Sequence, residues 1–451
     1  MKFNSLNISN EMKKNLDSLG YTEMTPVQEQ TLPLSLKNRD IIAKAKTGSG
    51  KTLSFAVPLL NNLKTSLFRI QAMILCPTRE LANQVANELK KIARYQHNIK
   101  ITTLCGGMPY RPQVHSLSHQ AHIIVGTPGR ILKHLGEKSF DPKDINTLVL
   151  DEADRMLDMG FNEDINKIIN FIPKNRQTLL FSATYPSDIK NLAKNILTNP
   201  TTIEIEATQD KVNINQKFFQ VQNKDKVNTI LRVFDTIKPE STIIFCNTKI
   251  DCDNLADDLE DKGATLLVIH SDLEQRQREQ TLVLFEARSY PILIATDVAS
   301  RGLDIEDVDL VINYDLAFDT EVHTHRIGRT ARAGKGGNAI SFVTEDSLHI
   351  YDELESKETL TSTKELNENA YIPTSLWQSI YINGGKKQKI RTGDILGALT
   401  GDIGLNKEDV GKITIQPMCS YVALRKNIAK ATHKKLEQTR IKGKYFKVYM
   451  K

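Results

Sequence analysis

Several features that would restrict the function of this chain are missing from it. No apolar run approaches the roughly 20 residues that span a bilayer, and the opening stretch, MKFNSLNISNEMKKNLDSLG, has no apolar core of signal-peptide length. We therefore expect a cytoplasmic protein. The five cysteines form no CxxC pair, which argues against a zinc site and against a disulfide framework. We expect reduced thiols, most of them buried.

The chain is long and ordinary in composition, but its charge is unevenly distributed. At 451 residues it exceeds the size of a single core, so two or three domains are expected. Residues 379 to 451 hold 16 Lys or Arg and 5 Asp or Glu, a net +11, whereas the rest of the chain carries −5. This asymmetry is typical of an appendage that binds a polyanion, because each phosphate contact releases a condensed counterion. A solvated basic face would produce the same charge.

Short apolar, β-branched runs alternate with helical patterns, which is typical of parallel sheets with crossover helices. One such helix is predicted after the second run, at residues 79 to 96. The runs of the first series lie at residues 40–45, 72–76, 122–126, 147–151 and 178–182. Those of the second series lie at residues 242–246, 265–269, 291–295, 310–314 and 338–342. The repeated pattern predicts two α/β domains of similar design.

Two polar stretches suggest where the domains end. One lies at residues 206 to 216, and the apolar periodicity fades around residues 356 to 370. The remaining residues follow the order strand, helix, strand, strand, helix, strand, which is that of RRM-like RNA-binding domains. We predict parallel-sheet domains at 1–207 and 208–355, a linker at 356–374, and a small α+β domain at 375–451.

The segment AKTGSGKT at residues 45 to 52 follows a predicted strand and precedes a predicted helix. In a P-loop the backbone N–H groups cradle phosphates, Lys51 reaches the β- and γ-phosphates, and Thr52 binds Mg²⁺. Ala45 stands where the first glycine is usual, and a glycine-rich turn that caps a helix is the alternative interpretation. The candidate nucleotide-binding residues of this loop are Ala45, Lys46, Thr47, Gly48, Ser49, Gly50, Lys51 and Thr52.

Two further charged segments fit phosphoryl transfer. VLDEAD, at residues 149 to 154, places Asp151 to bind the metal and Glu152 to orient the attacking water. An acidic strand end in a loop would look the same, but the P-loop favours catalysis. HRIGRTARAG, at residues 325 to 334, places Arg326, Arg329 and Arg332 at helical spacing. Negative charge develops on the γ-phosphate during transfer and needs compensation. We therefore favour arginine fingers, side chains that reach the transferred phosphate, over a solvated basic face.

Eight motifs in order and spacing resemble those of the DEAD-box RNA helicases. They are GYTEMTPVQ, AKTGSGKT, PTRELA, TPGR, DEAD, SAT, ATDVASRGLD and HRIGRTAR, and they cover residues 3 to about 345. The resemblance implies two RecA-like domains that hydrolyse ATP with Mg²⁺ and remodel RNA. It also implies that Arg329 and Arg332 meet the γ-phosphate only after the domains close.

The resemblance assigns roles to individual positions. Thr25 and Gln28 are expected to read adenine, with Tyr21 stacking on the base and Phe3 packing upstream, and Asp304 is expected to contact the ribose. Ser182 and Thr184 are expected to couple the catalytic carboxylates to RNA binding. The expected RNA-backbone contacts are Pro77, Thr78, Arg79, Gly106, Gly107, Thr127, Gly129, Arg130, Gln275, Arg278 and Thr296.

The tail stretch INGGKKQKIRTGDILGALTGDIGLNKEDVGKI resembles the RNA-binding domain of a bacterial group of these helicases that is directed to large-subunit ribosomal RNA. Tyr421 occupies one expected base-stacking position, but Cys419 falls where another aromatic residue would stand. A basic loop is the other candidate RNA contact, although a solvated loop would have the same composition. Its cations are Lys386, Lys387, Lys389 and Arg391.

We therefore expect an ATP-dependent RNA helicase that binds a large-subunit ribosomal RNA hairpin in a ribosome precursor and acts in ribosome assembly. One alternative is a general DEAD-box helicase in messenger RNA turnover, although the tail sequence argues against it. Another is a non-catalytic, ATP-gated RNA clamp, which would require damage at Lys51, Glu152 or Arg332. A DNA translocase is disfavoured, because the closure contacts of the family read the 2′-hydroxyl.

Overall fold

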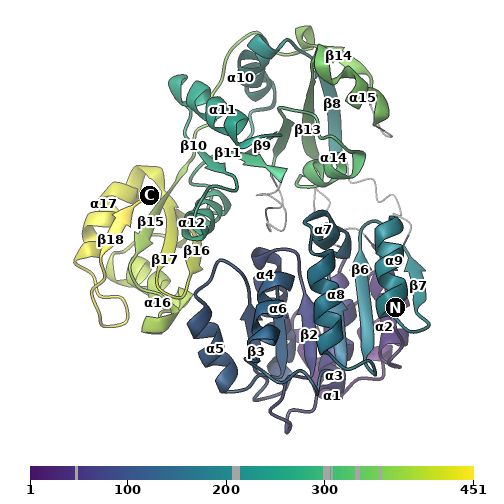
Figure 1. The fold of residues 1–451 in the computed structure, drawn as a ribbon. Helices are drawn as coiled ribbons and strands as arrows, with labels where there is room; N and C mark the ends of the chain where they lie inside the picture. Colours follow the sequence, from purple (N-terminus) through teal and green to yellow (C-terminus); the bar gives the residue numbers. More distant parts are fainter. Residues whose placement is uncertain (46–48, 206–213, 298–304, 306–307, 331–335, 355–357) are drawn as a thin grey trace. The chain divides into compact units, whose positions relative to one another are not determined.

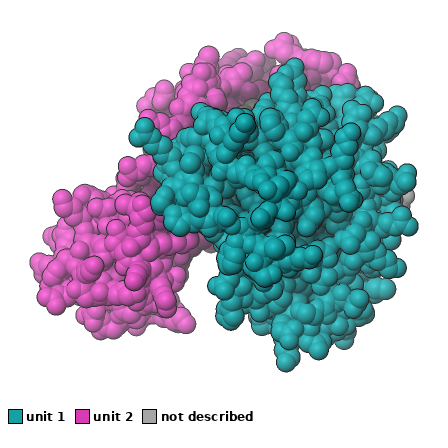
Figure 2. All heavy atoms as spheres, turned by 60° about the horizontal axis from the view of Figure 1, so that its bottom comes forward, with its two compact units in different colours: residues 1–210, 302–304 teal, residues 211–301, 305–451 magenta. Residues whose placement is uncertain are grey.

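The computed structural model describes the chain except residues 46–48, 206–213, 298–304, 306–307, 331–335 and 355–357. Five predicted site residues therefore lie outside the described residues: Lys46, Thr47, Gly48, Asp304 and Arg332. The chain divides into two compact units, one of residues 1–210 with 302–304 and one of residues 211–301 with 305–451 (Figure 2). Within the described ranges, no helix is long and apolar enough to cross a membrane.

The first unit is built on a parallel sheet in the order β3-β4-β2-β5-β6-β1-β7 (Figure 1). Its strands are β1 (Ile41–Lys44), β2 (Ala72–Leu75), β3 (Ile101–Leu104), β4 (Ile123–Gly126), β5 (Thr147–Leu150), β6 (Gln177–Ser182) and β7 (Thr201–Glu204). Its helices are α1 (Asn10–Ser18), α2 (Pro26–Ser35), α3 (Lys51–Asn62), α4 (Arg79–Ile92), α5 (Tyr110–Ser118), α6 (Pro128–Gly136), α7 (Ala153–Asp158), α8 (Asn162–Phe171) and α9 (Ser187–Ile196).

Both faces of this sheet are buried under helices. Successive strand residues alternate between two hydrophobic clusters: Phe181 of β6 packs in one and Leu180 in the other. Because crossover helices cover both faces of a parallel sheet, its central strands are apolar throughout rather than alternating with polar residues. The continuous apolar runs in the sequence are explained by this arrangement.

The second unit contains another parallel sheet, in the order β10-β11-β9-β12-β13-β8-β14. Its strands are β8 (Ile214–Gln220), β9 (Thr242–Cys246), β10 (Leu266–Ile269), β11 (Ile292–Thr296), β12 (Leu310–Asn313), β13 (Gly337–Val343) and β14 (Leu360–Ser362). Its helices are α10 (Lys226–Ile237), α11 (Lys249–Asp261), α12 (Gln275–Glu286), α14 (Thr320–Ile327) and α15 (Leu348–Glu353).

The segment predicted as a linker is packed on this second sheet. Leu360 begins β14, which pairs with β8, and Leu366 is buried in the hydrophobic core that Tyr371 and Ile372 also contact. These apolar residues are too widely spaced to show a period, so the sequence indicated a linker where the chain completes a domain.

The last part of the second unit is a four-stranded antiparallel sheet in the order β16-β17-β15-β18. Its elements are β15 (Trp377–Ile382), α16 (Thr392–Gly397), the single π-turn η7 (Ala398–Asp402), β16 (Val410–Ile415), β17 (Ser420–Arg425), α17 (Lys426–Glu437) and β18 (Val448–Met450). We call residues 375 to 451 the tail domain. Two parallel-sheet domains followed by this small α+β domain confirm the predicted fold class.

Candidate nucleotide and RNA site

The motif residues of the first unit follow the carboxyl ends of six neighbouring strands. The P-loop follows β1, the DEAD sequence follows β5 and the SAT sequence begins in β6, whereas the predicted RNA contacts follow β2, β3 and β4. Since the sheet order is β3-β4-β2-β5-β6-β1, the two groups occupy the two halves of one sheet edge. Ligands of open α/β sheets bind at this carboxyl edge.

The described part of the P-loop is held by two side chains from α2 and its N-cap. Thr25 Oγ1 donates to the Ser49 carbonyl at 2.7 Å, and Gln28 Nε2 donates to the Gly50 carbonyl at 3.0 Å. Gln28 is buried, and its Oε1 accepts from the Thr25 N–H at 2.9 Å. The predicted adenine-reading pair therefore also braces the phosphate loop.

Gly50 is required by this arrangement. Its φ of 88° lies in the left-handed region at the N-cap of α3, where a side chain is strained. A Cβ atom there would also lie 2.4 Å from Gln28 Nε2. Ala45, by contrast, continues the strand pairing, because its N–H donates to the Ser182 carbonyl at 2.9 Å. Ala45 is thus accommodated where a glycine is more usual.

Lys51 and Asp151 form the charged centre of this edge. Both are buried, and Lys51 Nζ donates to the Ala45 carbonyl at 3.0 Å. Burial raises the pKa of Asp151 to about 6, Lys51 opposes the rise, and Glu152 adds to it. Asp151 Oδ1 is buried and accepts no hydrogen bond from the described residues. An anionic oxygen left in this way fits a hard cation such as Mg²⁺, whose partners are carboxylates and phosphates.

Glu152 is held by a side chain that sequence reasoning missed. Its Oε2 accepts from Arg155 Nη1 at 2.7 Å, and both side chains are only 6% exposed. The backbone of Glu152 is left-handed, with φ of 54°, at the N-cap of α7. This strain is typical of functional positions. The i, i+3 spacing of Glu152 and Arg155 on α7 was the available sequence signal.

Asp154 connects the DEAD sequence to the SAT sequence. Its Oδ2 accepts from the N–H groups of Ala183 and Thr184, both at 2.9 Å, and from Thr184 Oγ1 at 3.2 Å. Ser182 Oγ in turn accepts from the Asp154 N–H at 3.3 Å. Ser182 and Thr184 are therefore brought against the catalytic loop by one carboxylate that was not among the predicted site residues.

The remaining nucleotide candidates occupy the same unit. Phe3 is buried in the hydrophobic core, against which Tyr21 also packs. The Tyr21 hydroxyl donates to Glu88 Oε1 at 2.5 Å, and burial together with that carboxylate raises the pKa of Tyr21 to about 12. Tyr21 is therefore a neutral ring anchored at its hydroxyl. Thr52 is partly exposed in the first turn of α3.

The RNA-contact candidates of the first unit lie in the loops after β2, β3 and β4 and in the first turns of α4 and α6. Thr78 caps α4 by accepting from the Leu81 N–H, and Thr127 Oγ1 accepts from the Gly106 N–H, both at 3.3 Å. Arg130 Nη1 donates to the Met108 carbonyl at 2.9 Å. The other members, Pro77, Arg79, Gly107 and Gly129, lie in the same three segments after β2, β3 and β4.

In the second unit, the prediction that Arg326 is one of three phosphate-reaching fingers needs correction. The guanidinium is buried and bonds to both carboxylate oxygens of Asp297, to Asn247 Oδ1 and to the Asp315 carbonyl. Helix α14 ends at Ile327, so Arg329 lies beyond the helix and the assumed helical spacing does not apply. Arg326 holds its own domain together, because its hydrogen-bonding groups are already used.

The other described candidates of the second unit are separate in sequence. Thr296 ends β11 and is buried, Gln275 and Arg278 lie in the first turn of α12, and Arg329 is 8% exposed. Their roles stay predictions, as do those of Asp304 and Arg332, which lie outside the described residues.

The basic loop of the tail domain faces solvent and is anchored through its backbone. Its four cations, Lys386, Lys387, Lys389 and Arg391, are exposed, and within the described residues none of the four has an ion pair. The N–H groups of Lys386 and Lys387 donate to the carbonyls of Gln416 and Pro417, at 2.9 and 3.0 Å. A Cβ atom at Gly385 would lie 2.3 Å from the Gln416 carbonyl. The glycine therefore permits the close approach that presents the cations.

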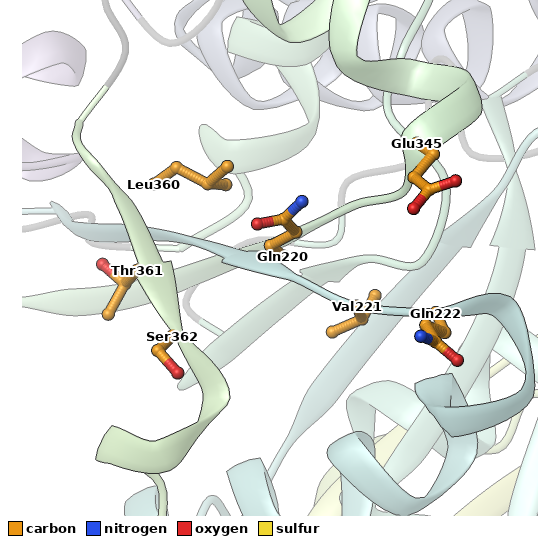
Figure 3. A pocket seen from close by; sticks show the side chains of 7 residues that line it. All are labelled: Gln220, Val221, Gln222, Glu345, Leu360, Thr361 and Ser362. Atoms are coloured by element: carbon orange, nitrogen blue, oxygen red, sulfur yellow. The ribbon is translucent and has the colours of Figure 1, made fainter.

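A pocket of about 430 Å³ lies elsewhere, beside β8 and β14 of the second unit (Figure 3). Gln220, Gln222, Glu345, Thr361 and Ser362 give it a mainly polar lining. No predicted site residue lines it, so it is separate from the motifs.

The fold and these motif positions are those of a helicase core, with a candidate nucleotide site and candidate RNA-contact segments. Family models match in the same order: DEAD/DEAH box helicase at residues 25–192, Helicase conserved C-terminal domain at 225–334, and DbpA RNA binding domain at 379–449. The chain belongs to the DEAD-box ATP-dependent RNA helicases, and within them to the DbpA type.

Relatives match over nearly the whole chain. The ATP-dependent RNA helicase DbpA of Escherichia coli strain K12 is 49% identical, covering 96% of each chain. DbpA of Bacillus subtilis strain 168 is 39% identical, covering 99% of this chain and 98% of that protein. Among solved structures, Saccharomyces cerevisiae Dbp5 bound to RNA and ADP BeF3 is similar, with a TM-score of 0.71, 30% identity, and coverage of 81% of this chain and 96% of that one. The predicted family and enzyme class are confirmed.

Proposed function

We propose that this helicase acts on large-subunit ribosomal RNA during ribosome assembly in the cytoplasm, and that the tail domain selects the RNA. The observation that carries the proposal is the exposed basic loop of residues 386 to 391, whose cations form no ion pair with the part of the chain that the structure describes, on a domain of the DbpA RNA-binding type. Because backbone hydrogen bonds hold this loop, less backbone freedom is lost when its cations meet phosphates. The alternative, a general helicase in messenger RNA turnover, has no comparable support in the tail.

We assign the nucleotide roles to the motif residues. Lys51 and the P-loop would hold the ATP phosphates. Thr52 and Asp151 would hold Mg²⁺, which supplies charge compensation when bound. Glu152, positioned by Arg155, would accept the proton of the attacking water or orient it. Thr25, Gln28 and Tyr21 would recognise adenine, with Asp304 at the ribose.

Arg329 and Arg332 would compensate the charge on the γ-phosphate after closure, which would explain stimulation by RNA.

RNA binding by the two parallel-sheet domains is expected to be indifferent to sequence. The candidates Thr78, Gly106, Thr127 and Arg130 would meet phosphates and 2′-hydroxyls, which carry no base identity. Ser182 and Thr184 would transmit the state of those loops to the carboxylates through Asp154. Specificity must then come from the tail domain.

The test is a full-length variant in which Lys386, Lys387, Lys389 and Arg391 are all changed to Gln. We expect the RNA concentration for half-maximal ATPase to rise for large-subunit ribosomal RNA, and to change little for an unrelated RNA. The slope of log affinity against log salt should become shallower by up to about 0.7 to 0.9 for each phosphate that the loop no longer neutralises. Turnover at saturating RNA should be unchanged.

The matched control removes four exposed cations of the first unit that lie outside every predicted RNA-contact segment: Lys37, Arg94, Lys190 and Lys194. This variant has the same net charge and should keep the preference for ribosomal RNA. If the tail variant also keeps the full preference for ribosomal RNA, the basic loop does not select the RNA, and the general-helicase alternative gains support.

A further inference from the structure

One face of the tail sheet is covered by a helix of the preceding domain. Cys419 and Tyr421 pack in a hydrophobic cluster with Val283 and Leu284 of α12, and Tyr381 lies against the same cluster. Tyr421 is 3% exposed and Cys419 is 9% exposed. The positions at which the sequence suggested base stacking are therefore occupied by protein.

This face is distinct from the one that forms the core of the tail domain. Ile380, Val422 and Leu424 pack with α16 and α17 in the tail core. Tyr381 and Tyr421, adjacent in sequence to these residues, point to the opposite face because strand side chains alternate. Changes at the tyrosine face therefore leave the core of the tail domain intact.

Polar contacts surround the apolar centre. Ser289 and Ser379 form a buried hydroxyl pair at 2.7 Å, and Lys412 Nζ lies 2.6 Å from Glu286 Oε2. Ser375 Oγ donates to the Arg288 carbonyl. The contact thus combines an apolar cluster with a buried hydroxyl pair and a partly exposed ion pair, and stable interfaces combine apolar and polar contacts in this way.

Helix α12, which covers the tail sheet, also carries two of the predicted RNA contacts. Gln275 and Arg278 lie in the first turn of α12, whereas Val283, Leu284 and Glu286 lie in its last turns. A helix transmits a displacement along its length, because each turn is hydrogen-bonded to the next. The same short helix therefore carries the docking contacts at one end and the predicted RNA contacts at the other.

We infer that the tyrosine face of the tail sheet is an intramolecular docking surface for α12, which makes the tail and the preceding parallel-sheet domain move as one body. Through this contact the tail positions Gln275 and Arg278 relative to the RNA that the basic loop holds. The second statement rests on the proposed function, whereas the docking itself does not.

The docking is tested by single-molecule energy transfer in the full-length protein without RNA or ATP. Dyes are attached through Asp257→Cys on α11 and Lys434→Cys on α17, both exposed, whereas the five native cysteines are buried. We expect one narrow distance distribution in the parent. Leu284→Lys should broaden it, because an ammonium replaces an apolar contact. Tyr421→Lys should do the same from the other side of the contact.

Ile250→Lys is the matched control, because this apolar residue of the same domain is already 63% exposed. It should leave the distribution narrow. Circular dichroism identifies a variant that fails to fold. In that case the distance distribution of the other docking variant decides the test. A broad distribution in the parent, or a narrow one in a folded docking variant, would overturn the docking.

The second statement, that the tail positions Gln275 and Arg278, is tested by measuring how strongly RNA stimulates the ATPase. Leu284→Lys and Tyr421→Lys should bind large-subunit ribosomal RNA as tightly as the parent, since the basic loop is untouched. The advantage of that RNA over unrelated RNA in stimulating ATPase should fall toward onefold, while stimulation by saturating unrelated RNA persists. Retention of the full advantage by undocked variants would refute the role. If the parent itself shows no advantage, the proposed function fails, and the distance measurement still decides the docking.

Discussion

Replacing Asp151 with Asn should stabilise the first unit while abolishing its ATPase activity. The carboxyl is buried, and its pKa is raised from 3.8 to about 6, mainly by desolvation. The folded state therefore binds this proton more tightly than the unfolded state does. A neutral Asn resembles the protonated carboxyl but does not carry the cost of ionisation.

The sign and magnitude follow from proton linkage. As pH rises, the unfolded state loses this proton first, so the free energy of unfolding falls between 3.8 and about 6 and stays low above it. The full cost is roughly 3 kcal/mol, since one pKa unit corresponds to about 1.4 kcal/mol. About half of it is present at pH 5, so a further amount of about 1.4 kcal/mol should develop between pH 5 and pH 8.

Hydrogen exchange of β2 and β5 in the absence of Mg²⁺ and nucleotide is the suitable assay, because a chain of several domains does not unfold in one two-state step. Trp377, the sole tryptophan, lies in the tail and does not report on the first unit. Intrinsic exchange rates cancel when parent and variant are compared at each pH. The protection ratio of Asp151→Asn to parent should be about tenfold larger at pH 8 than at pH 5.

A ratio that is independent of pH would refute the reasoning, because it would mean that Asp151 is not desolvated in the folded state. Lys51→Met provides a second check. The Lys51 charge opposes the rise in the pKa of Asp151, so its removal should increase the pH dependence of stability.

Three further outcomes are expected. Glu152→Gln should keep ATP affinity and lower turnover by about 10²- to 10⁴-fold in single-turnover assays, so unchanged turnover would exclude it as the base. Arg326→Ala should lower the free energy of unfolding of the second unit by roughly 3 to 5 kcal/mol, seen by hydrogen exchange, because it breaks the ion pair between the buried guanidinium and the partly buried Asp297. Arg329→Ala should instead cut turnover on the order of 10³-fold with a smaller loss of stability, as expected of a finger; a stability loss equal to that of Arg326→Ala would show that both arginines are structural.

The sequence predicted the central strands well and the outer ones poorly. The ten strands predicted for the two parallel sheets correspond to β1, β2, β4, β5, β6, β9, β10, β11, β12 and β13, whereas β3, β7, β8 and β14 were not predicted. Three of the missed strands are at the edges of their sheets, and β8 is next to an edge. Edge strands are partly exposed, as in the polar Thr201–Glu204, so they lack the continuous apolar run that marks a strand covered on both faces.

The candidate site divides in the same way. Residues that meet ligand appear as motifs, because nucleotide chemistry restricts both their type and their spacing. Residues that support them meet only protein, and their sequence signals are weaker: Asp154 lies within the DEAD sequence but was assigned no role, and Arg155 is marked only by its i, i+3 spacing from Glu152. Arg326 shows the opposite error. The regular spacing of Arg326, Arg329 and Arg332 suggested that Arg326 contacts the ligand, whereas the fold pairs it with Asp297.

The supporting residues matter because the first unit places several unfavourable features together. Gly50 and Glu152 both adopt left-handed backbones, and Asp151 is ionised only at a cost. Specific contacts accompany all three: Gln28 donates to the Gly50 carbonyl, Arg155 pairs with the Glu152 carboxylate, and the Lys51 charge opposes the rise in the pKa of Asp151. Strain of this kind persists only where the surrounding structure fixes it. The local conflict between stability and geometry therefore points to the site independently of any motif, because a sequence selected for stability alone would not retain it.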